Sequence, residues 1–176
     1  MRLDRLPICD PDTGDHLVVV ETPRGSRNKY DFDPRLHAMR LAAVLPAGMV
    51  FPYDFGFFPS TRADDGDPLD VLILMDDPAM PGCVLSVRLI GAIEAEQRGK
   101  KDETWTRNDR VLAVASHSHA HSRLESIDDL EPALLTEIEA FFAQYNRLKG
   151  SEFRVLRRAG PKRAAKIVEG NAAGKG

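Results

Sequence analysis

The chain has 176 residues, of which 43% are hydrophobic, and a formal net charge of −3 at pH 7. This length suits one domain with a sizeable core, and the net negative charge argues against the broad basic surface that nucleic acid binding requires. Cys9 and Cys83 are the only cysteines, too few for a disulfide framework and without the spacing of a zinc site. We therefore expect a cytoplasmic protein with no nucleic acid partner.

The N-terminal segment MRLDRLPICDPD contains charges and prolines before any apolar stretch develops. No apolar run in the sequence approaches the ~18 residues that a membrane-spanning helix needs. We expect neither secretion nor a membrane partner.

The first half of the chain predicts mostly β-structure. Residues 16–22 are rich in valine and read as a buried strand. Residues 29–33 alternate strictly, with Lys29, Asp31 and Asp33 on one face and aromatic residues on the other, so a polar row faces something other than core. Turn clusters separate the further strands that we expect at residues 71–75, 84–93 and 111–115.

The pattern becomes helical from Pro132 onward. Apolar residues recur at intervals of three and four up to Tyr145, caps are available at residues 126–129, and Gly150 stands where a C′ residue belongs. A second, shorter helix is expected from Pro161 to Glu169, with Gly170 as its stop. We expect a single domain over residues 1–170 and a disordered tail over residues 171–176.

The string DGDPLD places Asp65, Asp67 and Asp70 within six residues. Carboxylates this close together repel one another unless a cation lies between them, and a hard cation is the natural choice. Gly66 and Pro68 put the first two aspartates on a turn, whereas Asp70 leads into the strand VLILM. The alternative is an ordinary acidic turn. A calcium loop is excluded because no glutamate stands at the twelfth position and no helix flanks the string.

The stretch GMVFPYDFGFFPSTRADDGDPLDVLIL, residues 48–74, resembles the signature region of the soluble family I inorganic pyrophosphatases. In that family a Tyr/Phe-Pro-x-x-Tyr/Phe-Gly segment precedes a DGDPxD string by about ten residues. The resemblance extends to residues 21–33 (ETPRGSRNKYDFD) and to residues 141–150 (FFAQYNRLKG), in the same order. It covers most of the chain.

The resemblance implies an α+β, mainly β fold, an OB-like five-stranded barrel with flanking C-terminal helices. It also implies Mg²⁺-dependent hydrolysis of inorganic pyrophosphate to two phosphates by metal-activated water. A homo-oligomer, specifically a hexamer, in the cytoplasm is the expected assembly. Two alternatives stay open: hydrolysis of an organic diphosphate or a short polyphosphate, and a non-catalytic OB-type module with a structural cation site.

The same resemblance assigns site residues. Asp67 would orient or deprotonate the attacking water, Lys29 would bind a phosphate oxygen, and Tyr145 would donate its hydroxyl to the leaving phosphate. Arg110 and Arg147 would be further phosphate ligands. The metal ligands implied by the resemblance are Asp65, Asp67, Asp70, Glu21 acting through water, and Asn108.

Several positions depart from the family pattern. Ala43 stands where an arginine is usual, eight residues before Phe51, although Arg40 lies nearby. Phe51 and Phe55 replace two tyrosines and so remove two hydroxyls. Asn146 replaces a lysine, with Arg147 following it as a bidentate substitute. Asp31 takes the place of a glutamate and is one methylene shorter.

The second acidic cluster of the family is altered as well. Asn108 stands at an aspartate position and Arg110 at a lysine position, while Asp109 would face the opposite side of its strand. Glu94 and Glu96 are candidates to replace the acidic pair, with QRGKKDETWT as a longer loop. An asparagine ligand carries no charge, so we expect weaker Mg²⁺ binding or fewer bound ions.

His117, His119 and His121 alternate in the segment SHSHAHS. They could share a face only in an extended segment, and the serines around them favour a solvent-exposed polar loop over a transition-metal site.

Overall fold

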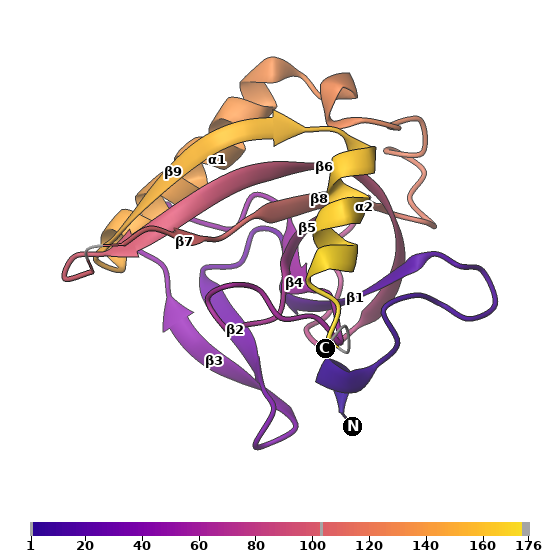
Figure 1. Ribbon diagram of the computed structural model, residues 1–176, viewed down its shortest axis with the longest axis horizontal. Coiled ribbons are helices and arrows are strands. Elements are labelled where there is room, and N and C mark those ends of the chain that lie inside the picture. The colour runs from indigo at the N-terminus through magenta and orange to yellow at the C-terminus, as the bar shows by residue number, and fades with distance from the viewer. Residues whose placement is uncertain (1, 103, 174–176) are drawn as a thin grey trace.

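The computed structural model describes residues 2–102 and 104–173. Figure 1 shows a strand-rich body with two α-helices on its outside. In chain order the elements are the 3₁₀ helix η1 (Leu3–Arg5), β1 (His16–Thr22), β2 (Asn28–Asp33), β3 (Ala38–Val44), β4 (Asp54–Phe57), β5 (Asp70–Leu74), β6 (Val84–Gly99), β7 (Thr106–Arg107), β8 (Arg110–Ala115), the 3₁₀ helix η2 (Ile127–Asp129), α1 (Pro132–Leu148), β9 (Ser151–Ala159) and α2 (Pro161–Gly170).

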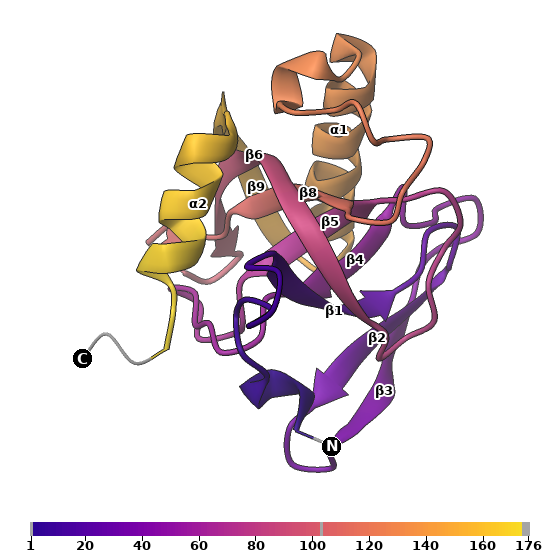
Figure 2. The same ribbon diagram turned by 90° about the vertical axis from the view of Figure 1, so that its right-hand side faces the viewer.

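A closed ring of five strands forms the centre of the molecule. Its order is β1-β4-β5-β8-β6, and β6 also pairs with β1, which closes the ring. The neighbours are antiparallel except β5 and β8, which run parallel. The expected mainly β fold, a five-stranded barrel flanked by C-terminal helices, is confirmed (Figure 2).

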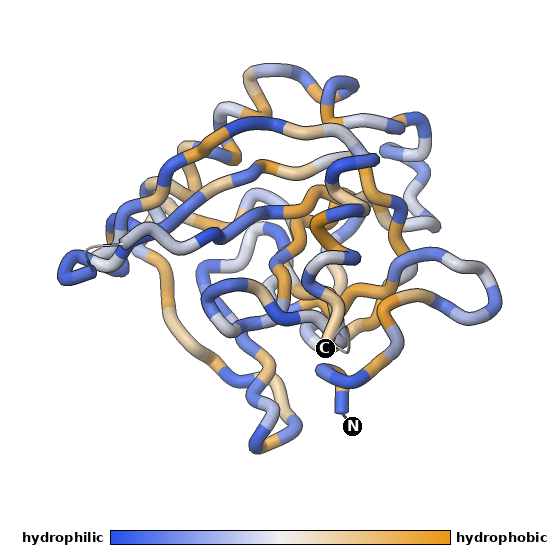
Figure 3. Tube along the Cα trace, viewed as in Figure 1, coloured by the Kyte–Doolittle hydropathy of each residue, from blue (hydrophilic) through white to orange (hydrophobic). Residues whose placement is uncertain are grey.

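Strand β5 is buried on both faces, which explains its continuous apolar sequence. Val71 and Ile73 belong to one core cluster, against which α2 packs, whereas Leu72 and Leu74 belong to a second cluster beneath α1. Figure 3 shows the hydrophobic residues along the central strands and the hydrophilic residues mainly in the outer loops. The string DGDPLD therefore precedes one of the most buried strands of the fold.

Helix α1 confirms the helix expected from Pro132. It buries Leu135, Ile138, Phe142 and Tyr145, and Gly150 has a φ of 80° just beyond its C-cap. The polar residues at 126–129 do not cap this helix. Ser126 and Asp129 form the capping box of η2, and α1 begins with Pro132 at N1 without a side-chain cap.

Helix α2 ends one residue later than expected. Gly170 is its last helical residue and Asn171 is its C-cap, so the prediction that Gly170 stops the helix is wrong. The carbonyl of Asn171 accepts a hydrogen bond from Arg62 N at 2.8 Å, and Ala173 N donates to Ser60 O at 2.7 Å. Residues 171–173 thus contact residues 60–62, and residues 174–176 of the tail expected to be disordered lie outside the described residues.

Four strands were not predicted, and one was predicted too short. Strand β7 has only two residues and β4 only four, β3 is largely exposed, and β9 carries charges between its apolar residues. Strand β6 continues to Gly99, through the first part of the segment expected to be a loop, because β9 pairs with it as far as Ser151. The pairing of these strands depends on partners that are distant in the sequence, and no local pattern specifies those partners. No helix in the described part of the chain is long and apolar enough to span a membrane.

Gly91 marks a close approach inside β6, where the pairing with β8 shifts between Leu89 and Gly91. A Cβ atom at this position would lie 2.6 Å from Ala159 O and 2.6 Å from Ile127 Cβ. Gly91→Ala should therefore lower the free energy of unfolding by about 2 kcal/mol, because backbone and core must both shift. Urea unfolding followed by circular dichroism measures this change.

The matched control is Gly170→Ala, since a Cβ atom at that helical position meets nothing within 4 Å. This variant should be neutral or slightly more stable. Equal stability of the two variants would contradict the packing constraint at Gly91.

Candidate active site

One large cavity, of about 680 Å³, opens beside the barrel. Its wall is built by β2 and β3, the loop before β5, the start of β8 and the end of α1. All predicted site residues except Arg147 line this cavity, namely Glu21, Lys29, Asp31, Asp65, Asp67, Asp70, Asn108, Arg110 and Tyr145. Residues distant in the sequence thus meet at one site.

The acidic string forms the expected turn. Asp65 Oδ1 accepts a hydrogen bond from Asp67 N at 3.2 Å, and Ala63 N donates to Asp67 O at 2.7 Å. Gly66, at the tip, has a φ of 92°, which favours glycine. Thr61 fixes the base of the loop, since its hydroxyl accepts from Leu69 N at 2.9 Å. The backbone therefore presents Asp65 and Asp67 to the cavity from a constrained turn.

Asp70 is the first residue of β5 and forms an ion pair with Arg110. Its Oδ2 lies 2.6 Å from Arg110 Nη1, and the same nitrogen donates to Asn108 Oδ1. Burial raises the pKa of Asp70, and the charge of Arg110 opposes that rise. Asn108 and Arg110 are themselves buried, so one guanidinium joins a strand-fixed carboxylate to a buried amide.

On the opposite wall, strand β2 supplies Lys29 and Asp31, which form an ion pair. Glu21, on β1, accepts a hydrogen bond from Phe32 N at 2.7 Å through Oε1. Burial raises the pKa of Glu21 to about 8. Glu21 is therefore largely protonated near neutral pH unless a cation approaches it.

Two polar atoms at this cavity are buried without a hydrogen-bond partner among residues 2–102 and 104–173. They are the hydroxyl of Tyr145 and Nε of Arg110. Both are donors, and burial raises the pKa of Tyr145, which keeps its hydroxyl protonated. Unpaired buried donors are costly, so the cavity fits an anionic ligand rich in acceptor oxygens.

Arg147 does not reach the cavity. It is exposed on α1 and is absent from the residues that line the cavity. Lys149 lines it instead, with Nζ 5.1 Å from the centre of the Tyr145 ring. The sequence contained the signal, since residues four apart lie on one helical face and Lys149 is four residues after Tyr145. Arg40 also lines the cavity, where it pairs with Asp33 at 3.4 Å. The sequence alone did not decide this contact, because it depends on the tertiary structure.

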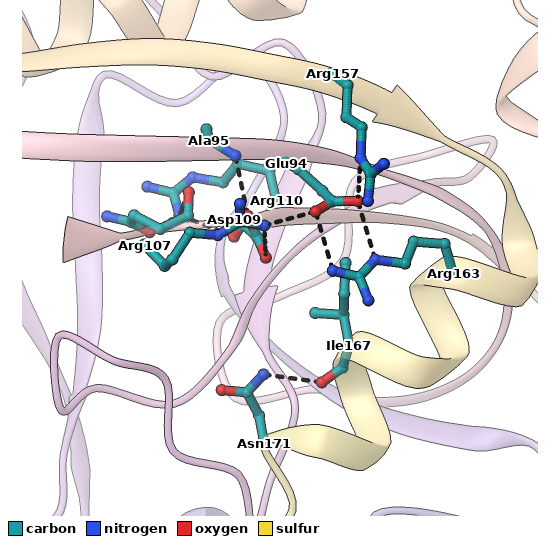
Figure 4. Close-up of polar contacts among 10 residues, drawn as sticks. Glu94, Ala95, Arg107, Asp109, Arg110, Arg157, Arg163, Ile167 and Asn171 are labelled. Atoms are coloured by element: carbon teal, nitrogen blue, oxygen red, sulfur yellow. Dashed lines mark hydrogen bonds and ion pairs between the residues drawn. The ribbon is translucent and has the colours of Figure 1, made fainter. Parts of the chain in front are cut away.

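Glu94, one of the candidates to replace a family carboxylate, does not line the cavity. It is 2% exposed and receives hydrogen bonds from Arg107 at 2.7 Å, Arg157 at 2.9 Å and Arg163 at 3.0 Å (Figure 4). These arginines come from β7, β9 and α2. The cluster ties three elements together, away from the residues that line the large cavity.

The other acidic candidates also point elsewhere. Glu96 pairs with Arg154 at 2.8 Å. Asp109 accepts from Ala95 N at 2.9 Å, on the side of the Glu94 cluster, as the strand geometry predicted (Figure 4). Gln97 is the β6 residue that lines the cavity, and its amide lies 3.5 Å from Asp65 Oδ2. An uncharged side chain thus stands where an acidic one was expected.

The histidine segment is made of turns, as expected for a polar loop. His117 and His119 are exposed, and the backbone of His119 and Ala120 donates to Asp76. Across residues 2–102 and 104–173, no three His, Cys, Asp or Glu side chains converge closely enough to hold a metal ion. At the acidic loop, Asp70 is paired with Arg110 at 2.6 Å.

The fold and the cavity together define a class of protein: a small closed β-barrel with carboxylates facing cationic and hydroxyl groups across a polar cavity. Comparison with known proteins identifies the family. The Pyrophosphatase family, described as inorganic pyrophosphatase, matches residues 18–173. The chain belongs to this family, and membership implies a divalent metal cofactor.

Individual relatives agree. The inorganic pyrophosphatase of Synechocystis sp. is 40% identical over 156 residues, covering 89% of this chain and 88% of the relative. The crystal structure of the inorganic pyrophosphatase from Thermus thermophilus superposes with a TM-score of 0.88 at 36% identity, covering 98% of each chain. That from Neisseria gonorrhoeae gives a TM-score of 0.83 at 30% identity and covers 95% of this chain and 94% of that one.

The arginine cluster makes a prediction about stability. Glu94→Gln should lower the free energy of unfolding by about 3 kcal/mol near neutral pH, because three guanidinium groups lose their shared counter-charge. The hydrogen bond from Arg163, with those from the other two arginines, lowers the pKa of Glu94 from 4.5 to about 2. A carboxylate with a lowered folded-state pKa stabilises above its unfolded pKa, and this contribution is lost as pH falls toward 2.

Urea unfolding at pH 7 and pH 3 checks this prediction. The difference between the wild type and Glu94→Gln should be smaller at pH 3. The control is Glu152→Gln, which removes an exposed ion pair with Arg98 and should change stability little at either pH. A difference that stays constant with pH would contradict the role of the charge.

Proposed function

We propose that this protein is an enzyme that hydrolyses inorganic pyrophosphate to two phosphates in the presence of Mg²⁺. One observation carries the proposal: the Asp65–Asp70 turn lines the same cavity as Lys29, Arg110 and Tyr145. Carboxylates suit Mg²⁺, and cationic and hydroxyl donors suit phosphate oxygens. Inorganic pyrophosphatases that cover nearly the whole chain support the choice of substrate.

The acidic end of the cavity would hold the metal. Asp65, Asp67 and Asp70 offer oxygen ligands from a turn and a strand end, and Glu21 would act through water once its proton is lost. Asn108 would contribute only an amide oxygen, which Arg110 already engages. Bound Mg²⁺ supplies a Lewis acid that activates water and neutralises charge on phosphate oxygens. Asp67, which no ion pair holds among the described residues, would orient the attacking water or take its proton.

The cationic and hydroxyl groups of the same cavity would bind the substrate phosphates. Lys29 would contact a phosphate oxygen as a point charge, Arg110 would contact a second one, and the Tyr145 hydroxyl would donate to the phosphate that leaves. Lys149 takes the place proposed for Arg147, since it lines the cavity beside Tyr145. In-line attack then requires only positioning and charge stabilisation from these side chains.

Asp67→Asn should reduce kcat for Mg²⁺-dependent phosphate release from pyrophosphate by at least ~100-fold, because an amide cannot accept the proton of the attacking water. The matched control is Asp64→Asn, three residues before Asp67 on the same loop but outside the large cavity. Its activity should stay near that of the wild type. Phosphate release is measured colorimetrically with and without Mg²⁺.

The outcomes separate the alternatives. If the wild-type protein shows no Mg²⁺-dependent turnover, the proposal that it is an enzyme is wrong. A non-catalytic module with a structural cation site is then favoured. Faster hydrolysis of ATP, an organic diphosphate or a short polyphosphate would transfer the proposal to that substrate class. Equal turnover in the wild type and Asp67→Asn would remove Asp67 from its assigned role.

Lys149→Ala should raise KM for pyrophosphate by roughly tenfold, with a smaller change in kcat, because a charged phosphate contact is worth ~1.4 kcal/mol or more. Arg147→Ala is the control on the same helix end and should change KM less than about twofold, since exposed charges contribute little. Steady-state kinetics with thermal unfolding of both variants tests this. A larger effect at Arg147 than at Lys149 would restore the sequence-based assignment.

We also propose that residues 1–170 form one domain, that the protein is cytoplasmic, and that it assembles as a homo-oligomer, specifically a hexamer. Cys9 and Cys83 are free thiols, which fits a reducing compartment. Leu41 and Val44 on β3 are 51% and 56% exposed, and such apolar side chains favour burial against another copy of the chain.

A further inference from the structure

Arg110 is a deeply buried charged residue that lines the cavity. Its side chain is 5% exposed, and its guanidinium lies 4.9 Å from the ring centre of Phe142, 5.6 Å from that of Phe153 and 5.9 Å from that of Phe55. Each aromatic face attracts a cation. The position is therefore built around a planar cationic group, and Phe55, without a tyrosine hydroxyl, forms part of its wall.

The polar side of the same guanidinium is turned to the ligand end of the site. Nη1 contacts Asp70 Oδ2 at 2.6 Å, Asn108 Oδ1, Asn108 O at 3.3 Å and Asp109 O at 3.1 Å. Asp70 and Asn108 are two of the proposed metal ligands. A cation of the protein thus already lies between them.

A guanidinium differs from an ammonium group in what it permits here. Arginine cannot lose its proton in a protein, and its planar head is fixed by stacking, whereas a lysine has a flexible stem and readily shifts its pKa. A divalent cation that approached both Asp70 and Asn108 would meet a positive charge that cannot be removed by deprotonation. Asn108 adds no negative charge to offset this repulsion.

We propose that Arg110 is a built-in counter-ion that replaces one divalent metal ion, so that the substrate-free protein binds one such ion fewer than it would with aspartate at residue 108 and lysine at residue 110. This inference rests on the proposed function, since it concerns the same metal-binding end of the cavity. In this proposal the uncharged Asn108 and the cationic Arg110 act together, since both weaken the attraction of this position for a metal ion. The carboxylate oxygens that remain available to a metal ion on the acidic turn are those of Asp65 and Asp67 and the second oxygen of Asp70, Oδ1.

Mn²⁺ binding in the absence of pyrophosphate tests the inference, because the electron paramagnetic resonance signal of free Mn²⁺ counts the bound ions directly. The double variant Asn108→Asp/Arg110→Lys should bind one more Mn²⁺ per chain than the wild type. Asn108→Asp alone should gain less than half of that, because the new carboxylate would pair with Arg110. Arg107→Lys, in the Glu94 cluster, is the control and should leave Mn²⁺ binding unchanged.

Equal Mn²⁺ numbers and affinities in the wild type and the double variant would overturn the inference. A full gain in Asn108→Asp alone would also overturn it, since the charge at residue 108 would then be sufficient. If the double variant fails to fold by circular dichroism, Arg110→Lys alone decides: the inference requires at least threefold tighter Mn²⁺ binding, and an unchanged affinity overturns it.

The proposed function can fail separately. Equal Mn²⁺ binding together with pyrophosphate hydrolysis by the wild type would remove only the role of Arg110. An absence of Mn²⁺ binding from every variant would overturn the metal site itself, and the inference with it.

Discussion

The crowding of carboxylates at the start of β5 is the constraint on which the rest of the site depends. Asp70 is fixed by a strand buried on both faces, so it cannot move far from Asp65 and Asp67 on the preceding turn. Such a group of negative charges needs cations nearby. The protein supplies one of them itself, through the ion pair of Asp70 with Arg110, and leaves the other carboxylates open to the cavity.

Barrel closure gives this charge arrangement its rigidity. Because β6 pairs with both β8 and β1, the strands that carry Glu21, Asp70 and Arg110 belong to one hydrogen-bonded ring. Helix α1 packs over the second core cluster and brings Tyr145 to the rim of the cavity. Strands and a helix therefore position Glu21, Asp70, Arg110 and Tyr145 in the proposed site, whereas Asp65 and Asp67 lie on a turn.

The altered positions form a physical pattern when they are viewed together. Phe55 and Asn108 both lie against Arg110. The ring of Phe55 forms part of the wall around the guanidinium, and the side-chain amide of Asn108 accepts a hydrogen bond from it. A change to arginine at a lysine position is compatible with the fold because aromatic residues surround the larger planar head. Relative to the pattern that the family resemblance implies, the metal-binding end has one negative charge fewer, and its positive charge is a planar guanidinium held between aromatic rings.

The sequence by itself determined the barrel strands with continuous apolar runs, both α-helices and the acidic turn, since burial periodicity and turn chemistry are local. Through the family resemblance it also selected Glu21, Lys29, Asp65, Asp67, Asp70, Asn108, Arg110 and Tyr145, all of which line the cavity. Only the tertiary structure decided that Glu94 serves an arginine cluster and that Arg110 occupies the space beside Asp70. Those outcomes depend on which side chains meet across β8, β9 and the helices, and long-range contacts of this kind leave no periodic trace in the chain.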